Sequence, residues 1–328
     1  MNMNLYYFFK ESVIKPGKPV NDMNTEEFNE IMEKFESYLK EAVELSATCR
    51  FEIAHQLWIG YSQAKNPNIT KANVYKQIAL GGEYPLTQYE EGLEQYAKLS
   101  GRHCPASDWE YTIECFEKAA MIAPHNNPSR DLVMEDGIVR KGNQVASHKM
   151  LANIYTQLSD YVKAEHHYRS ALKSIDTPCF DVLIAFGKFL LKKDVFQSDN
   201  SPAALAAEYA REEEGRDMLM EALRQYSALG REIFLGLGPQ PKEFYDSHCK
   251  EAHIQLFDYY KGSGGYCGHP GRAGDLRKCA KHYREAKALG FYESMYPDGF
   301  CILTHPVIMM RANAIELADD RDLSDIEY

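Results

Sequence analysis

Residues 159–174 read SDYVKAEHHYRSALKS, and this stretch decides the fold because its spacing is written five times along the chain. The stretch contains an acid, a small residue, two rings and a second small residue at fixed intervals: Asp160, Ala164, His167, Tyr168 and Ala171. This spacing of residue types is called the frame. The frame recurs as Asn68, Ala72, Tyr75 and Ala79; as Asp108, Thr112, Cys115, Phe116 and Ala119; as Gly215, Met218, Leu219 and Ala222, without the leading acid; and as Asp275, Cys279, His282, Tyr283 and Ala286. Such internal repetition is typical of stacked helical arrays, so it predicts an all-α fold.

A second motif precedes each frame and predicts a partner helix. Its three positions are occupied by Leu57, Trp58 and Tyr61; Gly92, Leu93 and Tyr96; Leu151, Ala152 and Tyr155; Phe186, Gly187 and Leu190; and Leu256, Phe257 and Tyr260. A small residue lets a neighbouring helix approach closely, and a ring fills the gap between layers. One hairpin cannot bury both of its faces, so about five antiparallel pairs are expected to stack on one another.

The frames begin at residues 68, 108, 160, 211 and 275. Plain repeats of this type have a period of about 34 residues, so these spacings leave extra chain that must lie in loops or lengthened helices. The candidate insertions are residues 124–144, 194–210 and 235–247, and a glycine-rich loop at 262–274. The expected organisation is an extended arm at 1–25, a helix at 26–48, the repeats at 49–291, and a closing helix with an acidic tail at 292–328.

Composition restricts the function classes. Of 328 residues, 45% are hydrophobic and 26% charged, and 37 basic against 48 acidic residues give a net charge of −11. That balance argues against a general nucleic-acid binder, which needs a basic surface, and suits a basic protein partner. The eight cysteines do not resemble the framework of a short secreted chain. No signal peptide or membrane-spanning stretch is recognisable, so a cytoplasmic location without membrane insertion is expected.

The frames resemble the Sel-one-like repeats and the related tetratricopeptide repeats. AHIQLFDYYKGSGG at 252–265, followed by DLRKCAKHYREAKALG at 275–290, resembles the Sel-one-like form, whereas HKMLANIYTQLSDYVKAEHHYRSALKS at 148–174 is similar to the tetratricopeptide form. The resemblance covers roughly residues 50–290 and implies a right-handed superhelical solenoid whose first helices line a concave, partner-gripping face. The positions it implies for that face are His55, Gln56, Ile59, Glu90, Glu91, Glu94, Lys149, Asn153, Ile184, Lys188, Gln255 and Asp258.

The function expected from the resemblance is a non-enzymatic scaffold for protein–protein interaction. A narrower hypothesis is a bacterial immunity-type protein that binds and neutralises a toxin or effector, because an acidic chain would associate quickly with a basic partner. One alternative is an adaptor or regulator that binds a peptide or small signal in the concave groove. A second alternative is a zinc-binding or catalytic protein that uses C-terminal cysteines and histidines.

The residues for that second alternative are Cys249, His253, Cys267, His269, Cys279 and His282, which are ligand types that zinc prefers. Against it, Cys279 and His282 occupy frame positions that normally pack in the core, and the chain contains no CxxC pair. The adjacent His166 and His167 are candidates for acid–base chemistry, but no serine elbow or HExxH motif accompanies them. The sequence therefore assigns no catalytic residue, metal or cofactor.

Overall fold

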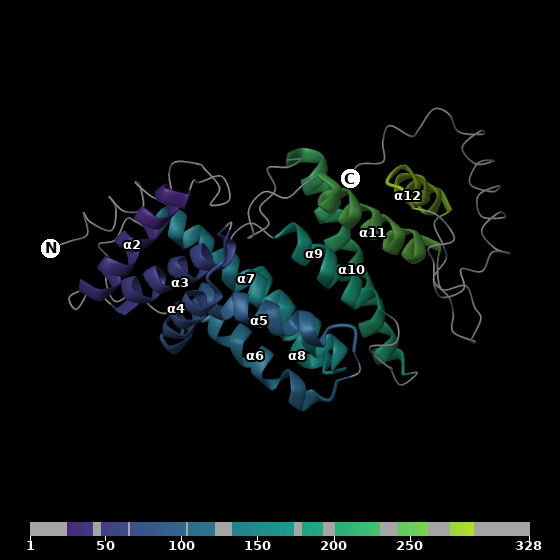
Figure 1. Cartoon of the computed structure of the whole chain (residues 1–328). Helices are drawn as coiled ribbons and strands as arrows, with labels where there is room; N and C mark the ends of the chain where they lie inside the picture. Colours follow the sequence, from purple (N-terminus) through teal and green to yellow (C-terminus); the bar gives the residue numbers. More distant parts are fainter. Residues whose placement is uncertain are drawn as a thin grey trace. The chain divides into compact units, whose positions relative to one another are not determined.

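The structure is a computed structural model that describes residues 25–41, 47–64, 66–102, 104–121, 133–173, 179–192, 201–229, 242–261 and 276–291 (Figure 1). These residues form eleven helices and no strand, which confirms the predicted all-α class. The helices are α2 (Thr25–Glu41), α3 (Ala47–Gln63), α4 (Ile69–Gly81), α5 (Pro85–Leu99), α6 (Ala106–Ala120), α7 (Val133–Gln157), α8 (Tyr161–Lys173), α9 (Phe180–Leu191), α10 (Pro202–Leu229), α11 (Lys242–Lys261) and α12 (Leu276–Ala288).

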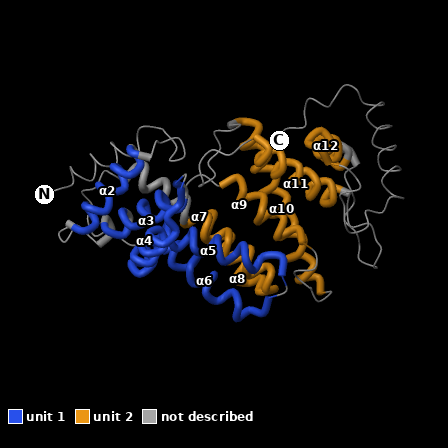
Figure 2. The backbone as a smooth tube through the Cα atoms, viewed as in Figure 1, with its two compact units in different colours: residues 1–130 blue, residues 131–328 orange. Residues whose placement is uncertain are grey.

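The chain divides into two compact units, residues 1–130 and 131–328 (Figure 2). The first unit holds α2 to α6 and the second holds α7 to α12. The boundary falls inside the first insertion expected from the sequence, at 124–144. None of the helices in the described part of the chain has the combination of length and apolar character needed to cross a membrane.

Adjacent helices pack as pairs, as the repeated motifs predict. The pairs are α3 with α4 and α5 with α6 in the first unit, and α7 with α8, α9 with α10 and α11 with α12 in the second. Consecutive pairs also touch within each unit, through α4 and α5, through α8 and α9, and through α9 and α10 against α11. The right-handed superhelix implied by the family resemblance stays a prediction.

The frame positions are core positions. Their small residues are almost completely buried, as Ala72, Ala79, Ala164, Ala171, Ala222 and Ala286 show. In three pairs, the ring of the first-helix motif stacks on the ring of the frame: Tyr61 on Tyr75, Tyr155 on His167, and Tyr260 on His282. Centroid separations are 5.9, 5.4 and 5.5 Å and interplanar angles 10°, 1° and 4°. One local arrangement is therefore built repeatedly from the repeated sequence.

Two glycines allow α9 and α10 to approach each other closely. A Cβ atom added to Gly187 would lie 2.8 Å from Leu219 Cγ and 2.9 Å from the carbonyl oxygen of Gly215. A Cβ atom on Gly215 would in turn lie 3.0 Å from the carbonyl oxygen of Gly187. The backbones of the two helices are in contact at this point, and a larger side chain at either position would collide with the other helix. Glycine is therefore required here for close packing.

The described parts of three expected insertions lengthen helices. Residues 133–144 belong to α7, residues 202–210 to α10, and residues 242–247 to α11. α10 begins as its sequence indicates: the Ser201 hydroxyl accepts a hydrogen bond from the Ala204 amide at 3.2 Å, and Pro202 occupies the first turn. The helix then continues without a break into the fourth frame, so insertion and repeat form one 28-residue helix.

The N-terminal helix α2 packs against α3. In α2, Met32 and Phe35 are buried against Leu57 and Trp58 of α3, with Phe28, Ile31 and Leu39 packed at the edge of the same cluster. The predicted arm up to residue 24, the glycine-rich loop at 262–274, and the closing helix and tail at 292–328 lie outside the described residues.

Candidate partner-binding surface

The ten side chains predicted to bind a partner lie on the first helices of the five pairs. They are His55 and Gln56 on α3; Glu90, Glu91 and Glu94 on α5; Lys149 and Asn153 on α7; Lys188 on α9; and Gln255 and Asp258 on α11. In the first unit, α3 and α5 are joined by the contact of His55 with Thr87. Whether any of the ten contacts a partner stays a prediction.

The prediction that the twelve positions of the concave face point outward is wrong for His55, Glu91 and Ile184. Ile184 is 1% exposed and packs in the hydrophobic core. His55 and Glu91 are 6% and 7% exposed, because each directs its polar group to another helix. His55 Nδ1 lies 2.8 Å from Thr87 Oγ1 on α5. Burial lowers the pKa of His55 to about 4, so its ring is neutral at pH 7 and exchanges one hydrogen bond with the threonine hydroxyl.

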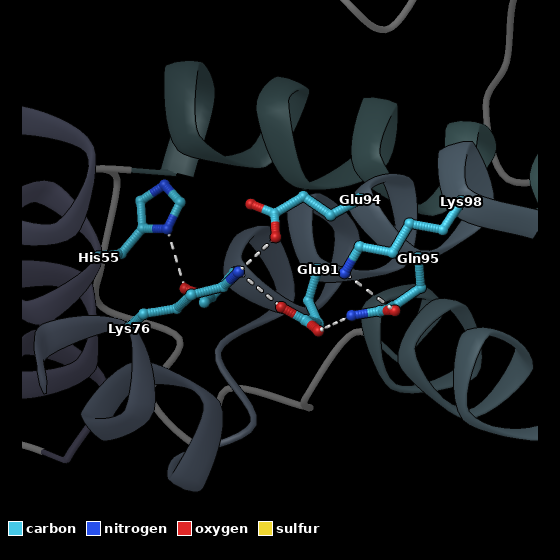
Figure 3. A network of polar contacts seen from close by, with 7 residues as sticks. His55, Lys76, Glu91, Glu94, Gln95 and Lys98 are labelled. Atoms are coloured by element: carbon cyan, nitrogen blue, oxygen red, sulfur yellow. Dashed lines mark hydrogen bonds and ion pairs between the residues drawn. The ribbon is translucent and has the colours of Figure 1, made fainter. Parts of the chain in front are cut away.

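Lys76 of α4 is the centre of a polar network on α5 (Figure 3). Its Nζ atom lies 2.6 Å from Glu91 Oε2 and 2.7 Å from Glu94 Oε2. The Gln95 amide donates to Glu91 Oε1 at 2.7 Å, and Lys98 Nζ donates to Gln95 Oε1 at 3.3 Å. These contacts tie the second helix of one pair to the first helix of the next, and they hold the Glu91 and Glu94 carboxylates in position.

Burial and charge act in opposite directions in this network. Burial disfavours the charged forms of Lys76 and Glu91, but their polar contacts together outweigh it. The pKa of Lys76 is therefore raised by Glu91 and Glu94, and that of Glu91 is lowered by Lys76 and Gln95. Trp58 also stabilises the charged form of Lys76, because Lys76 Nζ lies 4.8 Å from the centre of the Trp58 ring. The Lys76 and Glu91 side chains are only 10% and 9% exposed, so this is a structural ion pair and is not freely available to a partner.

Two carboxylates of the same helix remain available to solvent. Glu90 is exposed, and the Glu94 side chain is 50% exposed although it contacts Lys76. The separation of four residues places them on one side of α5. The three carboxylates of Glu90, Glu91 and Glu94 face the two ammonium groups of Lys76 and Lys98, so this face keeps an excess of negative charge.

The other predicted residues include two lysines that join first helices of consecutive pairs. Lys149 of α7 forms an ion pair with Asp181 of α9, and Lys188 of α9 forms one with Glu251 of α11. Asn153 accepts a hydrogen bond from the Tyr168 hydroxyl within its own pair, at 2.9 Å. Gln56, Gln255 and Asp258 are half-buried.

The sequence reasoning missed the partners of these groups, although a positional signal existed. Thr87, Asp181 and Glu251 each lie five residues before the first position of the motif in their own helix, at Gly92, Phe186 and Leu256. Each receives a polar contact from the preceding first helix. Comparing this position across repeats would have identified it as a junction between pairs.

The candidate zinc ligands are only partly brought together. His253 and His282 face each other with Nδ1 atoms 2.9 Å apart, whereas Cys249 and Cys279 pack in two different hydrophobic clusters. Cys267 and His269 lie outside the described residues. Within the described ranges, no three histidine, cysteine or acidic side chains are grouped so that they could hold a metal ion.

His167 and three of the cysteines pack against other side chains. His167 stacks on Tyr155, and burial lowers the pKa of its ring to about 4. Burial raises the pKa of the Cys115 and Cys249 thiols to about 11 and 12. Burial also raises the pKa of Cys179, whose thiol donates to Asp181 at 2.8 Å. These thiols are therefore held in the protonated, weakly nucleophilic form.

Comparison of the chain with protein-family models, with curated proteins and with solved structures gave no match.

Proposed function

We propose that this protein is a non-enzymatic scaffold whose helix pairs stack as a superhelix and bind another protein, with α5 contributing a carboxylate-bearing face for a basic segment of that partner. The observation that carries the proposal is the pair of exposed carboxylates, Glu90 and Glu94, beside a network that Lys76 and Gln95 hold in place. Because Lys76 holds the Glu94 carboxylate in place, that group needs little reordering when a cation arrives, which favours binding.

Charge supports the same assignment. The net charge of −11 favours fast association with a basic protein and slows the approach of acidic ones. As the narrower form of the proposal, the partner is a toxin or effector that this chain binds and neutralises, in the manner of an immunity protein. That form rests on the family resemblance and on charge complementarity.

The test is affinity capture from lysate of the source cells, with the wild-type chain and two matched variants as bait. The surface variant is Glu90→Lys with Glu94→Gln, which leaves the buried Glu91 intact. The control is Glu110→Lys with Glu117→Gln, which makes the same charge change at exposed positions of α6. A stoichiometric basic partner should be captured by wild type and control and lost from the surface variant.

Capture by all three baits would place the partner elsewhere and refute the role of α5. For the narrower form, co-expression of the captured protein should be toxic without this chain and harmless with it. Failure to relieve toxicity would remove the immunity assignment and leave the scaffold. If no protein is captured, binding of a peptide or small signal becomes the hypothesis to test.

A further inference from the structure

Two helix pairs contain the same histidine arrangement. In α7 and α8, His148 and His167 face each other with Nδ1 atoms 3.1 Å apart, and in α11 and α12, His253 and His282 do so at 2.9 Å. Each couple is closed on one side by a tyrosine of the first helix, Tyr155 or Tyr260, stacked on the frame histidine. His148 and His253 both lie three residues before the first motif leucine, so the positions are equivalent.

The geometry of each couple restricts its protonation. With one proton on the two facing nitrogens, one Nδ1–H donates to the lone pair of the other Nδ1, and the contact is satisfied. When both rings are protonated at Nδ1 and Nε2, two Nδ1–H donors face each other without an acceptor, and two positively charged rings lie with these atoms about 3 Å apart, a separation that desolvated like charges do not tolerate. The closed hairpin therefore accepts the neutral couple and rejects the doubly protonated one.

Charged neighbours do not relieve this restriction. Around His253 and His282, the acting charges are the ammonium groups of Lys278 and Lys281 on α12, which oppose further protonation. From the other helices packed against α11, Lys188 of α9 is engaged with Glu251, and Arg216 of α10 with Tyr259. The burial of both rings and these cations lower the pKa of His253 to about 4 and of His282 to about 3.

The couple in α7 and α8 has similar surroundings. His166 and Lys163 of α8 act on His167, and they oppose its protonation. α9, which packs against α8, directs its Asp181 to Lys149 and its Lys188 to Glu251. Burial lowers the pKa of both His148 and His167. These rings are half-buried, whereas His253 and His282 are 6% and 2% exposed, so the second couple is the stricter one.

We infer that these histidine couples are acid-operated latches: mild acid opens α7 from α8 and α11 from α12, while α9 and α10, which contain no histidine, remain paired. In an open hairpin each histidine ring has a pKa near 6.5, so the open state binds protons that the closed state does not bind. Between pH 7 and pH 5 this raises the opening equilibrium constant roughly 25-fold for each ring that stays neutral when closed.

The first pair supplies an acid-insensitive version of the same contact. There, Ala54 stands where His253 stands in the fifth pair, and Tyr75 stands where His282 stands, stacked on Tyr61. The double variant His253→Ala with His282→Tyr therefore rebuilds in α11 and α12 a closure that the chain already uses. The variant His148→Ala with His167→Tyr does the same for α7 and α8.

The experiment is hydrogen exchange of the full chain at pH 7 and pH 5, read by mass spectrometry and corrected for the intrinsic pH dependence of exchange. In wild type, protection should fall at least about 20-fold in α11 and α12, fall less in α7 and α8, and stay unchanged in α9 and α10. Each double variant should abolish the response in its own hairpin and keep it in the other, so each serves as the control for the other.

Equal corrected protection at both pH values in wild-type α11 and α12 would overturn the inference, as would a full response that persists in the His253→Ala, His282→Tyr variant. If that variant does not fold at pH 7, the rings of the wild-type chain are titrated by nuclear magnetic resonance instead. His253 and His282 must then stay neutral down to the pH at which α12 separates from α11. Normal titration near pH 6.5 in the closed state would refute the latch.

Discussion

His55 of α3 and Thr87 of α5 join the first helices of two consecutive pairs through a 2.8 Å contact between Nδ1 and Oγ1. Lys149 and Asp181 make the equivalent contact between α7 and α9. His55 and Lys149 both lie two residues before the first motif leucine, and Thr87 and Asp181 both lie five residues before the first motif position of their own helices. The same junction is thus built from a neutral couple in one unit and from an ion pair in the other.

This equivalence predicts the effect of Thr87→Asp. A carboxylate beside His55 should raise the pKa of that ring from about 4 by about 1 to 3. In wild type, the folded-state pKa lies below the unfolded value of about 6.5, so the stability associated with His55 is complete above that pH. It is lost at up to about 1.4 kcal/mol per pH unit as the pH falls toward 4. Thr87→Asp should reduce this loss.

The measurement is titration of the His55 ring by nuclear magnetic resonance, with the signal assigned by its absence in His55→Gln. Thr87→Val is the matched control, because it removes the hydroxyl without adding charge and should leave the pKa of His55 low. An unchanged pKa in Thr87→Asp would mean that the two side chains are not in contact.

Lys76→Met should destabilise the first unit by about 3 kcal/mol, because it leaves the buried Glu91 carboxylate without its ammonium partner. Both tryptophans of the chain, Trp58 and Trp109, belong to this unit, so urea unfolding followed by tryptophan fluorescence reports on it directly.

The control for that prediction is Lys34→Met. Lys34 pairs with Glu30 at the surface, with side chains 58% and 69% exposed, and its loss should cost less than about 1 kcal/mol. Adding Glu91→Gln to Lys76→Met should recover part of the stability. Equal stability of Lys76→Met and Lys34→Met would show that the Lys76 pair is not buried.

Gly187→Ala should lower the free energy of unfolding of the second unit by about 1 to 3 kcal/mol, because the new methyl group meets the carbonyl oxygen of Gly215. Gly81→Ala is the matched substitution: nothing lies within 4 Å of its added Cβ, and it should be neutral or stabilising by up to about 1 kcal/mol. Thermal unfolding followed by circular dichroism distinguishes the two. Similar effects of both substitutions would disprove the close approach.

Thiol labelling should follow burial. Cys104 is partly exposed, whereas Cys115, Cys179 and Cys249 are buried and have raised pKa values. At pH 8, an alkylating reagent should modify Cys104 at least tenfold faster than these three, which should react only when the chain unfolds. Peptide mass spectrometry after a timed pulse gives the rates. Fast modification of Cys115 in the folded chain would contradict the packing of α5 against α6.

Most of the fold was predictable because it depends on patterns within short stretches. The frame at 160–171 specifies one helix face, and the motif at 151–155 specifies the face that covers it, so the pair follows from about 25 consecutive residues. The lengths of α7, α10 and α11 were less predictable, because polar insertions continue a helix or leave it according to packing beyond the pattern.

The candidate surface was predictable only as a set of positions. Family resemblance identified Glu91 and His55 as outward-facing, but burial depends on what the next pair presents. Glu91 contacts Lys76, and His55 contacts Thr87. Neither Lys76 nor Thr87 occupies a position of the two repeated motifs.

The sequence by itself determined that the described chain is helical, that its helices form five pairs, and which ring and small residues pack inside each pair, because these depend on neighbours along the chain. Only the tertiary structure decided which polar side chains form contacts between one helix pair and the next. The contacts His55–Thr87, Lys149–Asp181 and Lys188–Glu251 span 32, 32 and 63 residues. Their formation depends on the register in which one pair stacks on the next, and no local periodicity encodes that register.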